Sequence, residues 1–151
     1  MQSATQFSVF LVSKPGILAQ VCDALAGDKI NIVALSMMDS NEHGVLRMIT
    51  EDTRRTRECL RRLNLPTAET EVLVVELPNR PGAMADICSR LGSDHVAINY
   101  AYCTGGAASS NGGGGARAIL KVSDLPKALK TLEVRRPRRK ALAIRPVKMS
   151  R

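Results

Sequence analysis

One short pattern occurs twice in this chain of 151 residues. Lys14-Pro15-Gly16 opens one apolar-periodic segment, and Arg80-Pro81-Gly82 opens a second one 66 positions later, from position 14 to position 80. The two segments align at this offset without a gap, and apolar residues match apolar residues. An internal repeat of this kind indicates two copies of one structural unit. We therefore predict a first unit at residues 1–70 and a second unit at residues 71–151.

Each copy shows the alternation of strand and helix patterns that is typical of a small α+β unit. Short β-branched and aromatic runs predict strands, and apolar residues spaced three and four apart predict helices. The expected fold class is α+β, with two ferredoxin-like βαββαβ units packed through antiparallel sheets. The predicted strands are residues 7–12, 29–37, 45–50, 71–77, 95–103 and 117–122, and the predicted helices are residues 17–27, 52–63, 83–91 and 124–132.

Residues 71–77 pose a topological difficulty. This segment should close the first unit as its last strand, yet it should also open the second unit by leading into Arg80-Pro81-Gly82. We expect that one strand cannot occupy both places. A further strand is therefore predicted at residues 140–148. We expect it to pair with a sheet edge that this sharing leaves open, with the sheet of the first unit as the candidate partner.

The net charge of +8 comes from the C-terminal segment alone. Residues 135–151 hold eight Lys and Arg and no acidic residue, which leaves 14 basic residues (22 less 8) against 14 acidic ones elsewhere. This basic segment could contact nucleic-acid phosphates, although a solvated linker is the commoner use of such a run. RNA-binding sheets need stacking aromatic residues, and the chain has two Phe, two Tyr and no Trp.

A Gly-rich segment at residues 104–116 lengthens the second copy between its middle strands. Gly-rich loops that cradle phosphate lead into a helix with a Lys-Ser/Thr pair, whereas a strand is predicted here. We expect the tip of a hairpin.

Several classes of protein are disfavoured by what the sequence lacks. No window is apolar enough for a membrane span and no signal segment is evident, so we expect a cytoplasmic protein. The four Cys are expected to be reduced thiols. No catalytic constellation, metal-ligand cluster or cofactor motif stands out, so we expect no enzyme and no cofactor. Units of about 70 residues are near the lower limit for independent stability, so we expect the two halves to pack on each other or the chain to form a homodimer.

The two repeated segments resemble the ACT domain, a ferredoxin-like module that binds amino acids. The resemblance rests on the basic-Pro-Gly turn, on the following Leu-Ala or Met-Ala, and on a helix that ends before Ile30-Asn31-Ile32. The stretch from Leu77 to Ala85 is similar to the form found in small proteins made only of two ACT units. The resemblance covers about residues 7–132 and implies a non-catalytic regulatory or sensory role.

The resemblance also implies where an amino acid would bind. A carboxylate is favoured at the helix N-terminus after each Pro-Gly turn, and Gly allows a close approach. Asn31 matches the polar ligand-binding position of the family, but the second copy has Ala97 there and offers Asn79 in its loop instead. We therefore expect one or two composite pockets between the copies. The candidate binding residues are Lys14, Pro15, Gly16, Ile17, Leu18, Asn31, Asn79, Arg80, Pro81, Gly82, Ala83, Met84 and Asn99.

Other interpretations remain open at this stage. Each Pro-Gly pair fits a plain turn before a helix. The protein as a whole fits a protein-interaction or assembly module, or a weak nucleic-acid binder that uses its basic C-terminal segment.

Overall fold

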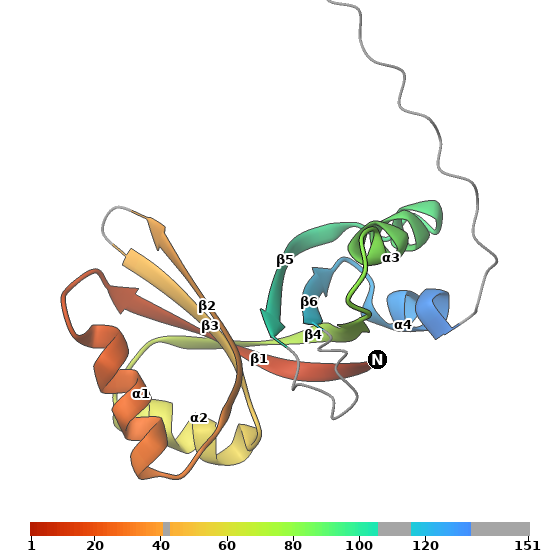
Figure 1. The fold of residues 1–151 in the computed structure, drawn as a ribbon. Coiled ribbons are helices and arrows are strands. Elements are labelled where there is room, and N and C mark those ends of the chain that lie inside the picture. Colours follow the sequence, from red (N-terminus) through yellow and green to blue (C-terminus); the bar gives the residue numbers. More distant parts are fainter. Residues whose placement is uncertain (41–42, 106–115, 134–151) are drawn as a thin grey trace, which may run out of the picture.

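The computed structural model describes residues 1–40, 43–105 and 116–133 (Figure 1). Strands and helices alternate in the predicted order, although several strands are longer than the sequence indicates. No helix in these three segments is long and apolar enough to cross a membrane. The strands are β1 (Gln2–Val12), β2 (Ile32–Ser40), β3 (His43–Thr50), β4 (Thr67–Leu77), β5 (Ile98–Gly105) and β6 (Ala116–Val122), and the helices are α1 (Ile17–Gly27), α2 (Thr53–Arg62), α3 (Ala83–Ser93) and α4 (Leu125–Glu133).

All six strands form one antiparallel sheet in the order β2-β3-β1-β4-β6-β5. The first four strands of this order are the arrangement of a complete ferredoxin-like unit. The last three, with α3 and α4, repeat the unit from β4 onward. The predicted α+β fold with two ferredoxin-like units is therefore confirmed.

The expectation that one strand cannot serve both copies is wrong. β4 pairs with β1 along Thr67–Val74 and with β6 along Leu73–Leu77, so its first part closes the first copy and its last part opens the second. β1 is also longer than predicted, because it begins at Gln2. Its early residues pair with the later part of β4 and supply the strand that the second copy lacks. The strand predicted at residues 140–148 lies outside the described residues, and the predicted unit boundary between residues 70 and 71 falls within β4.

The pairing of β1 with β4 relates the two copies by an internal two-fold axis. Gln2 pairs with Val74 and Ser8 pairs with Ala68, and adding the repeat offset of 66 to positions 2 and 8 gives positions 68 and 74. The pair of Thr5 and Glu71 maps onto itself, so the axis passes through it; the Thr5 hydroxyl donates to Glu71 at 2.9 Å. Both copies also share a strand irregularity, between Ile32 and Ala34 and between Ile98 and Tyr100.

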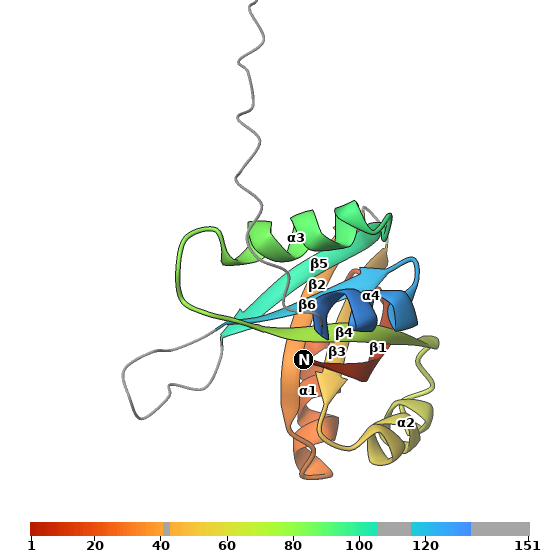
Figure 2. The same ribbon diagram turned by 90° about the vertical axis from the view of Figure 1, so that its right-hand side faces the viewer.

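Two separate cores lie between the sheet and its helices. Alternate residues of β1 and β3 pack against α1 and α2 around Phe7 and Leu46, and those of β4 and β6 pack against α3 and α4 around Leu73 and Leu120. The strand register places both cores on the same face of the sheet. Because the sheet twists strongly between its halves, the two helix pairs point in different directions in Figures 1 and 2.

The other face of the sheet holds a third core that joins the copies. Ala34, Ile49, Val72, Val74 and Ile119 are buried together there, and β2 approaches β5 across this face. Beside this core, fully buried Gln6 donates to the Tyr100 hydroxyl at 2.7 Å and accepts from the Tyr102 hydroxyl at 3.0 Å. Burial raises the pKa of Tyr102, so its hydroxyl keeps its proton. The two halves are thus joined by apolar packing and by a buried polar cluster.

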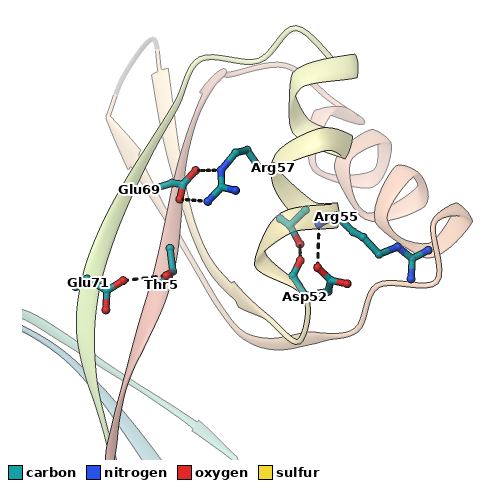
Figure 3. Close-up of polar contacts among 7 residues, drawn as sticks. Thr5, Asp52, Arg55, Arg57, Glu69 and Glu71 are labelled. Carbon is teal, nitrogen blue, oxygen red and sulfur yellow. Dashed lines mark hydrogen bonds and ion pairs between the residues drawn. The ribbon is translucent and has the colours of Figure 1, made fainter.

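Polar contacts fix α2 against the sheet (Figure 3). The Asp52 carboxylate accepts from the backbone N–H of Arg55 at 2.9 Å, which caps the helix. Arg57 binds Glu69 on β4 through two contacts of 2.6 and 2.7 Å. Asp124 caps α4 in the same way as Asp52, accepting from the N–H of Lys127 at 2.9 Å.

Candidate functional site

The Pro-Gly turn of the second copy borders a pocket of about 410 Å³. The pocket lies on the helix-covered side of the sheet, where β4 ends and α3 begins. A volume of this size is in the range of small-molecule sites. Its lining consists of Leu77, Pro78, Asn79, Arg80, Gly82, Ala83, Met84, Ala85 and Ala116. Five of the thirteen candidate residues therefore border one cavity, hereafter the loop pocket: Asn79, Arg80, Gly82, Ala83 and Met84. The candidate Pro81 is not part of this lining.

The backbone conformation of Gly82 forms this turn. Its φ is +83°, in the left-handed region that favours glycine. The Gly82 carbonyl already accepts from the N–H of Asp86 at 2.9 Å, so the helix starts directly after the turn. No side chain caps the N-terminus of α3. A helix N-terminus in this state favours an anionic group such as a carboxylate.

Charged and polar side chains stand beside the turn. Arg80 binds the carboxylate of Asp86 at 2.6 Å, which orients the guanidinium along the first turn of α3. Exposed Asn79 also borders the pocket, and Leu77, Met84 and Ala116 supply apolar surface. The pocket therefore combines donors for an anionic group with a small apolar wall.

The turn of the first copy has the same backbone but a different environment. Gly16 also has a φ of +83°, and no side chain caps α1. Ile17 is buried in the first core and Leu18 packs against it, while Lys14 and Pro15 are exposed. These residues border neither the loop pocket nor the second cavity described next.

Asn31 lies near a second cavity, on the opposite side of the sheet. Its side-chain amide donates to the Glu51 carboxylate at 2.9 Å. Glu51 borders a cleft of about 310 Å³ between the two copies, hereafter the inter-copy cleft. Neither of these two cavities is therefore bordered by both Asn31 and the Pro81-Gly82 turn. Asn99 is exposed on β5 and borders neither cavity.

A family model described as an ACT domain pair matches residues 2–109. That span is more than half of the 151 residues. The chain belongs to the ACT domain pair family. The matched region contains both Pro-Gly turns, the shared strand β4 and the helices α1 to α3.

Solved structures agree with this assignment to the ACT domain pair. The chain is 30% identical to protein BT0572 from Bacteroides thetaiotaomicron, with 87% of each chain covered and a TM-score of 0.78. The ligand-free regulatory subunit of aspartate kinase from Thermus thermophilus shares the fold at 14% identity, with 88% of this chain and 96% of that chain covered and a TM-score of 0.62. The corresponding subunit from Thermus flavus is similar at 15% identity, with 88% and 92% covered and a TM-score of 0.60. A search of the curated proteins finds no match.

Sequence reasoning expected pockets between the copies but none of the residues that line the inter-copy cleft. Its residues come from all six strands and from Glu51, which directly follows β3, and no local motif connects them. Only the register of β1 with β4, together with the repeat, shows which positions of the two copies face each other. The predicted strand at residues 7–12 lacked the first part of β1, which begins at Gln2 and places Gln2 and Ala4 in this cleft.

Proposed function

We propose that this ACT domain pair is a non-catalytic, cytoplasmic regulatory protein that binds an amino acid in the loop pocket. The observation that carries the proposal is the uncapped N-terminus of α3, which follows the left-handed Gly82 and borders a pocket of small-molecule size. In this site the ligand carboxylate lies against the first N–H groups of α3. Its side chain lies toward Leu77, Met84 and Ala116, and the Asn79 amide binds the polar end.

The residues around the loop pocket support a binding role in preference to catalysis. Arg80 is the one ionisable residue of the lining, and it is paired with Asp86. Within the described part of the chain, no three His, Cys, Asp or Glu are grouped to hold a metal ion. Reaction chemistry needs an acid, base or nucleophile beside the ligand, and the lining offers none.

Thermal melting of the full chain against each of the twenty amino acids tests the proposal. A ligand at 100 times its dissociation constant adds about 2.7 kcal/mol to stability, which raises the midpoint measurably. The shift should shrink in Asn79→Ala and persist in Asn31→Ala, because Asn79 borders the loop pocket and Asn31 does not. If none of the twenty shifts the midpoint, or if only Asn31→Ala removes the shift, the loop pocket is not the site.

A second proposal, a homodimer, rests on apolar residues that the first copy exposes. On edge strand β2, Leu35 and Met37 are 38% and 42% exposed. The matching positions on the other edge strand, β5, are Ala101 and Cys103. Natural edge strands are usually protected by charge or by coverage, so the unprotected edge favours pairing of β2 with a second copy of the chain.

Sedimentation equilibrium of matched variants tests this assembly. Met37→Lys should convert a dimer to a monomer, because a charge at the contact opposes edge pairing. Cys103→Lys places the same charge at the matching position of β5 and should leave the dimer intact. A wild-type protein that remains monomeric at high protein concentration would remove the proposal.

The nucleic-acid alternative depends on residues 135–151, which lie outside the described residues. Titration with a generic RNA at two salt concentrations tests it. Binding through phosphates weakens steeply as salt rises. Binding that is absent or independent of salt would exclude this role.

A further inference from the structure

The inter-copy cleft lies on the face of the sheet that carries no helices. Its floor is the third core, in which Ile49, Val74 and Ile119 are buried. Both copies contribute to it, so the cleft exists only because the sheet curls and brings them together. It is lined by Gln2, Ala4, Val33, Ala34, Ile49, Thr50, Glu51, Val74, Thr104, Arg117 and Ile119.

The internal two-fold axis defines a matching place on the same face, and that place is filled. Ala34 corresponds to Tyr100 at the repeat offset of 66. After the Gly-rich segment the offset is 72, as for Asp52 and Asp124, so Arg47 corresponds to Ile119. The Arg47 guanidinium lies over the Tyr100 ring, 4.4 Å from its centroid. It also donates to the Met38 sulfur at 2.8 Å. Two large side chains thus occupy the space where the cleft would be.

In the cleft itself, smaller residues stand at the corresponding positions. Ala34 replaces the ring of Tyr100, and Ile119 replaces the long side chain of Arg47. Protein interiors are close-packed and seldom keep voids larger than a water molecule. Because the same fold accepts a filled version in the other half, the fold does not require the open cleft.

Two charged residues also distinguish the cleft from its filled counterpart. Glu51 comes from the first copy and Arg117 from the second, and the matching positions are Ser123 and Val45. The Glu51 carboxylate accepts a hydrogen bond from the Asn31 amide at 2.9 Å. Because this amide is neutral, it does not balance the negative charge of Glu51. The ion pair that Arg117 forms with exposed Glu76 is long, at 4.0 Å. Neither charge is strongly neutralised within the protein.

The strand order separates these two charges. Arg117 lies on β6 and Glu51 directly follows β3, so β4 and β1 lie between them in the sheet. Neighbouring strands are about 4.8 Å apart, yet Glu51 and Arg117 border the same cleft, whose floor is apolar. A ligand that contacts both therefore needs an apolar middle with opposite charges at its two ends.

We propose that the inter-copy cleft binds a short aliphatic molecule with an amino group at one end and a carboxylate at the other, an ω-amino acid. The amino group binds Glu51, the carboxylate binds the Arg117 guanidinium, and the methylene chain covers Ile49, Val74 and Ile119. Charge-assisted contacts of this kind are the stronger class of hydrogen bond. This site is separate from the loop pocket, because Ala116 borders the loop pocket while Arg117, the next residue, borders the cleft on the other face.

Calorimetric titration of the full chain with 5-aminopentanoate tests the assignment. Its isomer L-valine carries the same groups on one carbon, and pentanoate and pentylamine each lack one end. We expect 5-aminopentanoate to bind at least about tenfold more tightly than each of these three compounds, since each loses one charge-assisted contact. Equal binding of all four, or no heat with 5-aminopentanoate at millimolar concentrations, would overturn the proposal.

Variants locate the site and separate it from the loop pocket. Glu51→Gln and Arg117→Met should each weaken 5-aminopentanoate by about tenfold or more. Ala34→Tyr, which copies the filled half, should abolish binding while the thermal transition remains. Glu58→Gln and Arg54→Met change an exposed ion pair on α2 and serve as charge-matched controls. If binding survives in Ala34→Tyr, or if Asn79→Ala removes it, the ligand is not in the cleft.

Discussion

Gly82 shows how one residue sets the geometry of the loop pocket. Its φ of +83° disfavours any side chain, although a Cβ there would meet no atom within 4 Å. Gly82→Ala should therefore lower the free energy of unfolding by about 1–2 kcal/mol through backbone strain alone. Gly92, near the end of α3, is also unobstructed and has no positive φ, so Gly92→Ala should raise stability by up to about 1 kcal/mol. Denaturant titration measures the free energy of unfolding of both variants. A change of the same sign in the two variants would contradict the prediction.

Gln6 is the residue on which the polar contact between the copies depends. Its amide satisfies the hydroxyls of both Tyr100 and Tyr102 and is fully buried. Gln6→Ala leaves those hydroxyls without this partner and opens a void, so we expect a loss of about 2–4 kcal/mol. Gln20→Ala, at an exposed position of α1, should stay within about 0.5 kcal/mol of wild type. A comparable loss in the two variants would show that the buried amide has no special role.

At the scale of elements, the contact between α2 and β4 should depend on pH. The Arg57 guanidinium holds the pKa of Glu69 below its usual value of 4.5. A carboxyl whose pKa is lower in the folded state stabilises the fold above its unfolded pKa, and this contribution disappears as pH falls through the folded value. Glu69→Gln should therefore flatten the decline in stability below about pH 4.5. The measurement is urea unfolding at a series of acidic pH values.

Glu58→Gln provides the comparison for this element. The Glu58 carboxylate lies 3.7 Å from exposed Arg54, whereas Glu69 makes two shorter contacts with Arg57. Exposed ion pairs contribute little, so this variant should change the pH profile less than Glu69→Gln does. An identical profile for Glu69→Gln and wild type would remove the assigned role of the Arg57 contact.

The elements that could be predicted from sequence are those with a local signal. Apolar spacing gave the four helices, Asp52 marked the start of α2, and the repeat gave two copies. Residues 2–6 were missed because they are mostly polar and their partners in β4 lie more than sixty positions away. The Pro-Gly motif pointed to five of the residues that border the loop pocket. The lining of the inter-copy cleft could not be predicted, since it depends on the curl of the whole sheet.

At the scale of the whole molecule, the two copies should unfold together. Residues 2–6 of β1 close the second copy, and the first part of β4 closes the first. A chain that begins at Phe7 should therefore lose amide protection in Val72–Val74 by about tenfold or more, which is about 1.4 kcal/mol of local opening free energy. Hydrogen exchange followed by mass spectrometry measures this. Unchanged protection in β4 would mean that the N-terminal residues are dispensable.

The shared strand also constrains the order in which the chain can fold during synthesis. β1 emerges before β4, and Gln2–Val9 pair with residues of β4. Neither copy can therefore complete its sheet until β4 has been made. Pairings this distant in sequence raise contact order and slow folding. Until then the nascent first copy keeps one side of β1 unpaired, a strand edge of the kind that invites aggregation. The polar residues of its first half, Gln2 to Gln6, reduce that hazard while the rest of the chain is still being made.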